Sequence, residues 1–234
     1  MSERVQRIRV TFTRLEAQKY ITHLDLMRAW ERIFKRAEIP VTYSEGFTAR
    51  PRISFAAPLA VGVTSECEVL ELYTSRRIPP SQITQSVADE LPNGIEVRKA
   101  VEVPMARPSL QSMLRVASYH VVVSSDRSAT EWGNAIENFL SQHEIPWKHK
   151  RGDELREYDL RPLVFSIELL ENGEDVATLL LRLRNDTKGS GRPEQVTKAL
   201  GIASDPIRVH RVSLEFDEPS VARSAYRATG RMSN

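Results

Sequence analysis

The chain has 234 residues, of which 41% are hydrophobic and 27% are charged, and its formal net charge at pH 7 is +2. That length suits one large domain or two domains of about 110 residues each. No apolar run approaches the ~20 residues that a transmembrane helix needs, and the charged start MSERVQRIRV lacks the apolar segment of a signal peptide. We therefore expect a cytoplasmic protein without membrane contact.

The cysteine content restricts the possible cofactors. Cys67 is the only cysteine, which excludes intramolecular disulfides and any iron–sulfur or zinc site that needs several thiolates. It lies in the alternating run SECEVLEL, where a lone thiol is typical of a small buried apolar side chain. His143 and His149 are separated by Pro146 and have no third ligand at metal spacing. The sequence predicts neither a metal nor a cofactor.

The first part of the chain reads as β-α-β-β-α-β. Alternation predicts strands over 5–15, 65–74 and 95–103, and a short helix is expected in 79–94. A longer helix begins after Thr22, which forms a capping-box-like pair with Asp25, and ends before Pro40. The apolar stripe expected to face the core of that helix is Leu24, Met27, Trp30, Ile33, Phe34 and Ala37.

The same order recurs after a proline-rich joint. Strands are expected over 118–125 and 207–216, with a hairpin over 163–185 that turns near Asn172-Gly173. Helices are expected over 128–146 and 192–202, and the charge-balanced segment 142–162 between elements reads as a solvated loop. Two such copies predict an α+β fold of two tandem ferredoxin-like (βαββαβ) units with antiparallel sheets. The expected domains are 1–107 and 108–216, followed by a disordered tail over 217–234.

The connection YSEGFTARPRISFAAPLAVGV, residues 43–63, is the part that core packing explains least. Gly46 and Pro51 restrict the backbone around Phe47 and Arg50. A rigid loop that exposes an aromatic ring and guanidinium groups could hold a phosphate or stack on a base. The expected contacts are Arg28, Arg32, Lys35, Arg36, Phe47, Arg50 and Arg52, converging on one concave patch. A solvated helix face with ordinary ion pairs explains the four helix cations equally well.

These residues carry a resemblance to a known family. The segment KYITHLDLMRAWERIFKRAEIPVTYSEGFTARPRISFAAPLAVGVTSECEVLEL is similar to the hallmark region of the bacterial radical SAM-linked protein family, whose function is uncharacterised. The resemblance implies a partner, a radical S-adenosylmethionine enzyme, rather than an activity. Family members usually have asparagine, proline and histidine where this chain has Thr48, Ala49 and Arg50. With one cysteine, this chain cannot hold a three-thiolate cluster and is at most the linked module.

His23 is the one candidate for a catalytic group. An N-terminal histidine on a helix could act as an acid or a base on a phosphodiester, with Arg50 or Arg52 steadying the phosphate. The layout resembles CRISPR repeat-processing ribonucleases. Those enzymes carry a glycine-rich loop before their last strand, whereas KGSGRP here precedes the last helix. A surface or capping histidine explains His23 as well.

The KGSGRP segment is a candidate anion site. Its glycines would free the backbone, the amides of the following helix would point at the loop, and cationic side chains would supply charge. The residues concerned are Arg184, Lys188, Gly189, Gly191 and Arg192. The lysine precedes the glycines, so the segment is not a P-loop, and a flexible hairpin-to-helix connection explains it equally well.

Three functions follow from the sequence. The first is a non-enzymatic binding protein that engages RNA or a ribonucleoprotein through the basic patch. The second is a metal-independent endoribonuclease that uses His23. The third, implied by the resemblance, is a protein-only adaptor of a radical SAM enzyme.

Overall fold

The computed structural model describes residues 4–151 and 154–217. Within these ranges the chain forms a nine-stranded sheet, a separate two-stranded hairpin and five α-helices, so the predicted α+β class is confirmed. Of the expected tail, only Asp217 belongs to the described residues, and its amide donates to the carbonyl of Met113 (2.7 Å). Residues 218–234 lie outside the described residues.

The first half runs from β1 to β4. Its elements are β1 (Gln6–Arg14), η1 (Glu16–Gln18), α1 (His23–Arg36), β2 (Ile53–Phe55), β3 (Thr64–Thr74), α2 (Pro80–Ala88) and β4 (Val97–Val103). β1 lies between β3 and β4, and β2 pairs with the other edge of β3, all antiparallel. The alternating residues Ile8, Val10 and Phe12 of β1 point into a core beneath α1 and α2, as their spacing predicts.

The second half runs from α3 to β11. Its elements are α3 (Leu110–Met113), β5 (Leu114–Ser124), α4 (Ala129–Ser141), β6 (Pro146–Arg151), β7 (Glu154–Asp159), η2 (Arg161–Leu163), β8 (Val164–Asn172), β9 (Val176–Asp186), β10 (Gly189–Ser190), α5 (Pro193–Ala199) and β11 (Arg208–Phe216). β5 lies between β11 and β9, and β8 pairs with the far edge of β9, again antiparallel. The expected hairpin and last helix are present, and a second core lies under α4 and α5.

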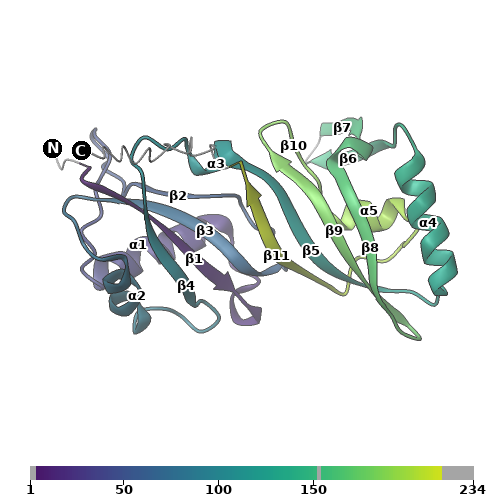
Figure 1. Ribbon diagram of the computed structural model, residues 1–234, viewed down its shortest axis with the longest axis horizontal. Coiled ribbons are helices and arrows are strands. Elements are labelled where there is room, and N and C mark those ends of the chain that lie inside the picture. The colour runs from purple at the N-terminus through teal and green to yellow at the C-terminus, as the bar shows by residue number, and fades with distance from the viewer. Residues whose placement is uncertain (1–3, 152–153, 218–234) are drawn as a thin grey trace, which may run out of the picture.

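The two halves share one sheet, which differs from the expected pair of separate antiparallel sheets. β11 pairs in parallel with the start of β3, where His210 is opposite Thr64 and Arg211 is opposite Ser65. This pairing is possible because β2 is short and covers β3 only from Leu70 onward, so the start of that edge is open. Figure 1 shows β11 and β5 leading from one half into the other, with α1 and α5 behind the sheet.

The apolar stripe of α1 is shifted from its expected position at one residue. Leu26, Trp30, Ile33 and Phe34 are buried, and the ring of Trp30 meets Phe12 edge-on at 4.8 Å. Leu24, which the spacing placed in the stripe, is 63% exposed. It is two residues before Leu26, which is about 200° further around the helix, so Leu24 faces away from the buried stripe. The expected cap is present, because the Thr22 hydroxyl accepts from the Asp25 amide (3.2 Å).

A buried arginine holds the second part of the 43–63 connection against the sheet. The guanidinium of Arg14 donates to three carbonyls of that connection, those of Leu59 (3.3 Å), Ala60 (2.5 Å) and Val63 (2.7 Å). Burial, the largest influence, lowers the pKa of Arg14. We call residues 56–63 the strap. Its role is structural, because its backbone carbonyls accept hydrogen bonds from both terminal nitrogens of a buried cation.

A second buried arginine connects the strap to the other half. Arg211 on β11 forms an ion pair with Glu68 on β3 (3.0 Å), and both side chains are 3% exposed. The same guanidinium donates to the carbonyl of Pro58 in the strap (3.0 Å) and to the Tyr119 hydroxyl on β5. Despite its burial, the pKa of Arg211 is raised because Glu68 and Tyr119 stabilise the cation. Every nitrogen of the Arg211 guanidinium therefore has a partner, and this polar contact lies in a join that also has an apolar cluster, including Val69 and Leu110.

Candidate nucleic-acid interface

The first part of the 43–63 connection is a narrow backbone hairpin, which we call the finger (residues 43–51). It is closed by a bridge between Tyr43 and Pro51 and by the Ser44 amide, which donates to the carbonyl of Arg50 (2.8 Å). Gly46 lies near its tip with a φ of +113°, a backbone angle that strongly favours glycine. The finger therefore has a defined shape, as the glycine and proline predict.

The finger exposes both an aromatic ring and a guanidinium group. Phe47 is fully exposed and Arg50 is also exposed. Arg52 at the base has a structural contact, because its Nε donates to the carbonyl of Tyr43 (3.3 Å). An exposed aromatic ring contributes nothing to the core, and on a surface loop it is free to contact a ligand. A ring with cations nearby is suited to stacking on a base.

The four cations of α1 form two groups, two with an ion-pair partner and two without one among the described residues. Arg28 pairs with Asp25 (3.4 Å), and Arg36 forms an ion pair with Glu90, just beyond the end of α2. Arg32 and Lys35 are exposed and have no ion pair with any carboxylate in the described ranges. The helix face is thus partly neutralised, as a solvated surface would be, and two of its cations are available to a ligand.

The last turn of α1 and the finger lie at the same end of the first half. After α1 the chain contacts the end of β3, where the Thr42 amide donates to the carbonyl of Tyr73 (2.7 Å). Arg36 is directed to the α2 side by its partner Glu90, and Arg28 lies about 12 Å further back along the helix axis. Of the two helix cations without an ion pair among the described residues, Lys35 lies in the last turn of α1, from which the chain leads to the finger.

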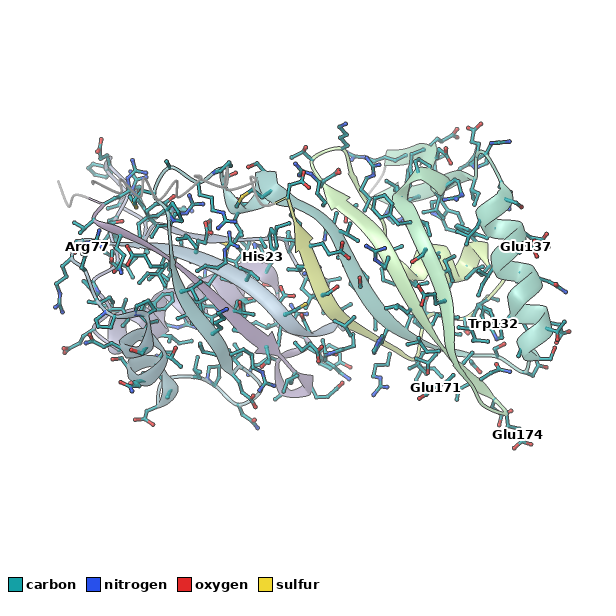
Figure 2. The ribbon with its side chains drawn as sticks, in the orientation of Figure 1. His23, Arg77, Trp132, Glu137, Glu171 and Glu174 are labelled. Carbon is teal, nitrogen blue, oxygen red and sulfur yellow. The ribbon has the colours of Figure 1, made fainter. Side chains whose placement is uncertain are left out.

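His23 lies in different surroundings. Figure 2 shows it at the end of the first half that lies toward the centre of the molecule. Its ring is partly buried and meets Phe55 edge-on at 5.4 Å. Burial, the largest influence, lowers the pKa of His23; Glu68 opposes this effect and Arg14 adds to it. Neither Arg50 nor Arg52 is among the charged groups that influence it.

A cavity of about 540 Å³ lies in the second half, and its wall includes four of the five residues expected at an anion site. These are Arg184, Lys188, Gly189 and Arg192. The opposite wall comes from β6 and β7, which Figure 1 shows gathered with β10 at one end of this half.

The backbone of the KGSGRP segment does not act as the sequence predicts. The amides of Lys188 and Gly189 already donate to the Asp186 carboxylate (2.7 and 3.1 Å), and the Gly191 amide donates to the carbonyl of Arg184. A Cβ at Gly189 or Gly191 would lie 2.7 or 2.9 Å from atoms of Leu163. The glycines therefore serve close packing rather than flexibility, and α5, which begins with Pro193, is too short to add an anion site.

The strands β6 and β7 contribute to the cavity wall and were not predicted from the sequence. Segment 142–162 was expected to be a solvated loop because its charges balance. Register pairs Lys148 with Glu157 and Trp147 with Tyr158, so hairpin pairing sets opposite charges and aromatic rings across from each other. A sequence signal was present, since Gly152-Asp153, a turn-forming dipeptide, separates two short runs that each contain an aromatic residue.

Other residue types add no further site. Burial raises the pKa of the Cys67 thiol to about 12, which keeps it protonated and unreactive. Among the described residues, no group of three or more histidine, cysteine, aspartate or glutamate side chains is placed to hold a metal ion. No helix in the described part of the chain is long and apolar enough to cross a membrane.

Comparison with solved structures identifies a related fold. One chain of the crystal structure of a Cbf5–Nop10–Gar1 complex superposes with a TM-score of 0.50 at 12% identity, covering 92% of this chain and 51% of that one. A chain of the archaeal box H/ACA sRNP Nop10–Cbf5 complex gives a TM-score of 0.45 at 12% identity, with 89% and 48% covered. This chain thus spans about half the length of each, and such low identity concerns the fold alone.

Sequence comparison places the chain in a family. No curated protein matches the sequence significantly. A family model described as "Uncharacterized protein conserved in bacteria (DUF2344)" matches residues 7–193, which is most of the chain. The chain therefore belongs to this bacterial family of uncharacterised proteins, DUF2344.

Proposed function

We propose that this chain is a non-enzymatic cytoplasmic module that binds RNA, either free or within a ribonucleoprotein. The observation that carries the proposal is Phe47, a fully exposed aromatic ring on a finger whose backbone is closed by hydrogen bonds. A base can stack on such a ring whatever its sequence, and nearby guanidinium groups attract the phosphates. The fold likeness to a chain of a Cbf5–Nop10–Gar1 complex is compatible with this proposal.

The contacts are arranged from the finger outward. Phe47 stacks on a base, Arg50 binds the adjacent phosphate, and Lys35 and Arg32 extend the track along the helix. Arg28, Arg36 and Arg52 contribute less, because Asp25, Glu90 and the Tyr43 carbonyl already engage them.

The test is the affinity of the full chain for a pool of single-stranded RNA, measured by fluorescence anisotropy over a range of salt concentrations. We expect Phe47→Ala to weaken binding by about 1–3 kcal/mol, the value of one stacked base. The triple variant R32Q/K35Q/R50Q should make the slope of log K against log[salt] shallower by about 2, since each phosphate contact of a single strand contributes about 0.7.

Matched controls separate these effects from general changes of surface. Leu170→Ala removes an exposed apolar side chain of β8, and R98Q/K99Q removes two exposed cations of β4. Both should bind RNA as the parent chain does. Absence of RNA binding at low salt, or equal loss in Phe47→Ala and Leu170→Ala, contradicts the proposal.

We also infer that each half is a ferredoxin-like unit, corresponding to residues 1–107 and 108–216. The strand orders β4-β1-β3-β2 and β11-β5-β9-β8 support this inference, because both run fourth, first, third, second in chain order with antiparallel neighbours. In each half, the helices connect strands in the pattern that the ferredoxin-like motif requires.

The two alternatives from the sequence remain separate proposals. A protein-only adaptor of a radical SAM enzyme would copurify with that enzyme as a stable complex free of nucleic acid. An endoribonuclease would lose RNA cleavage in His23→Ala. No contact of His23 favours this second alternative, because the phosphate-binding arginines that it needs are not among the groups that influence His23.

A further inference from the structure

The cavity in the second half has walls from two different connections. One wall is the β6–β7 hairpin, which follows α4 and contributes Arg156 and Tyr158. The other is the turn from β9 through β10 to α5, which contributes Lys188 and Arg192. The 3-10 helix η2, with Pro162 and Leu163, forms the floor between them. A hollow of about 540 Å³ is in the range of sites for small molecules.

Charge in this cavity is strongly one-sided. Its cationic residues are Arg156, Arg184, Lys188 and Arg192. Asp159 is the one carboxylate that lines it among the described residues, and its Oδ1 accepts from the amides of Ile145 (2.8 Å) and Arg161 (2.9 Å). That carboxylate is therefore already engaged by hydrogen bonds from backbone amides. Cations gathered in a hollow bind anions more strongly than cations spread on a flat surface, because the walls reduce screening by water.

The individual cations differ in how far they are already engaged. Arg184 is 3.7 Å from Asp186 and lies over the ring of Phe165, while its buried Nε has no hydrogen-bond partner. Lys188 and Arg192 are exposed, and no carboxylate of the described ranges forms an ion pair with either of them. Two cations are thus available at the mouth, and a third is held in place by packing.

The rest of the lining is apolar or neutral. The Tyr158 hydroxyl donates to the Oε1 of Gln195, which is 4% exposed, and this contact fixes the ring against the wall. Pro162 and Leu163 continue that wall. A bare inorganic anion would use the cations and leave this surface unfilled. A ligand with an anionic end and a flat, partly apolar body would use both.

We propose that this cavity binds a phosphate monoester attached to a nucleoside, with Lys188, Arg192 and Arg184 on the phosphate and the Tyr158 wall against the base and sugar. A monoester carries up to two charges near neutral pH, and several cations favour it over a singly charged diester. The ligand can be a free nucleotide or the 5′ end of an RNA chain, since both present this chemistry. The site is independent of the finger, which lies in the other half.

The test is isothermal titration calorimetry of the full chain with uridine 5′-monophosphate, adenosine 5′-monophosphate, uridine and inorganic phosphate. We expect at least one of the two nucleotides to bind at least tenfold more tightly than either uridine or inorganic phosphate. The variant K188Q/R192Q should weaken this binding at least tenfold. R98Q/K99Q, which removes the same charge from β4, should leave it unchanged. Both pairs are exposed, so neither variant disturbs the cores.

A second arm compares RNA oligonucleotides with a 5′-phosphate and with a 5′-hydroxyl. Tighter binding of the phosphorylated chain, lost in K188Q/R192Q and retained in Phe47→Ala, supports the site and assigns its ligand to an RNA end even where neither free nucleotide binds. Loss of binding to the 5′-hydroxyl RNA in Phe47→Ala tests the finger alone. The inference is overturned if neither the nucleotides nor the 5′-phosphate improve binding, or if K188Q/R192Q behaves as R98Q/K99Q does.

Discussion

The two halves have the same strand order. They differ in the connection that follows α1 in the first half and α4 in the second half. In the first half the connection from α1 to β2 contains the finger, which exposes Phe47 and Arg50. In the second half the connection from α4 to β8 contains the β6–β7 hairpin, which forms one wall of a cationic cavity. The same position in the two strand orders thus carries a projecting loop in the first half and the wall of a cavity in the second half.

This difference shows which parts of the molecule carry the two proposed binding sites. The sheet and its helices bury their apolar faces in two cores, and those residues have little freedom to change. Connections lie outside the cores and can carry exposed aromatic and cationic groups without loss of packing. The frame therefore positions the two elements, and the connections supply the contacts.

The largest predicted effect concerns the join on which both halves depend. Arg211→Met leaves Glu68 as a buried carboxylate without its partner. We expect the free energy of unfolding to fall by about 3–5 kcal/mol, the usual cost of breaking a buried ion pair on one side. Urea unfolding, followed by circular dichroism, measures it.

Two further variants give this prediction its controls. Arg208→Gln alters an exposed residue on the same strand and should change stability by less than about 0.5 kcal/mol. The double variant E68Q/R211M removes both charges and should be more stable than Arg211→Met alone. Equal stability of Arg211→Met and Arg208→Gln would mean that the pair does not hold the halves together.

A second prediction tests why the KGSGRP segment contains a glycine at position 191. Gly191→Ala would place a Cβ 2.9 Å from the Leu163 carbonyl oxygen and 3.1 Å from the Cβ of Leu183. We expect the free energy of unfolding to fall by about 1–3 kcal/mol, as it does at other overpacked sites. Gly133→Ala in α4 meets no atom within 4 Å and should stabilise the protein by about 0.5–1 kcal/mol. The midpoint of thermal unfolding distinguishes the two variants. Equal shifts of that midpoint would refute the packing explanation.

Much of the frame could be predicted from the sequence, because its signals are local and periodic. Alternation in β1, the Thr22 cap of α1 and the Asn172-Gly173 turn all depend on neighbouring residues. The join through β11 and β3 could not be predicted, because Arg211 and Glu68 are distant in sequence and periodicity does not reveal partners. Balanced charge concealed the β6–β7 hairpin for a related reason, since its opposite charges face each other across the two strands.

A third prediction concerns helix ends, where the two halves again differ. Ser128 and Glu131 form a complete capping box on α4, whereas Thr22 and Asp25 on α1 form only the half in which the hydroxyl accepts an amide. Ser128→Ala should lower the free energy of unfolding by about 1 kcal/mol, which is typical of a lost N-cap. Chemical unfolding at pH 7 measures the loss, and no loss at all would contradict the role of the box.

The capping box also has a pH dependence. Hydrogen bonds from the Ser128 backbone and hydroxyl hold the pKa of Glu131 below its usual value of 4.5. Because the folded-state pKa is the lower one, the stabilisation is complete above pH 4.5 and is lost as the pH falls through the folded-state value. The stability difference between the parent chain and Glu131→Gln should therefore shrink on acidification below pH 4.5, and a constant difference would contradict the mechanism.

The smallest predicted effect on stability is at the finger tip. Phe47→Ala removes a ring that is fully exposed to water in the folded protein, as it is in the unfolded chain. The change therefore affects the free energies of the two states about equally. We expect the free energy of unfolding to change by less than about 0.5 kcal/mol, although truncating a buried phenylalanine costs about 3–5 kcal/mol. Urea unfolding of the variant beside its RNA titration measures both properties. A loss of stability would show that Phe47 packs within the folded protein, and weaker RNA binding would then have a structural cause. Unchanged stability with weaker binding would instead assign the ring to a ligand.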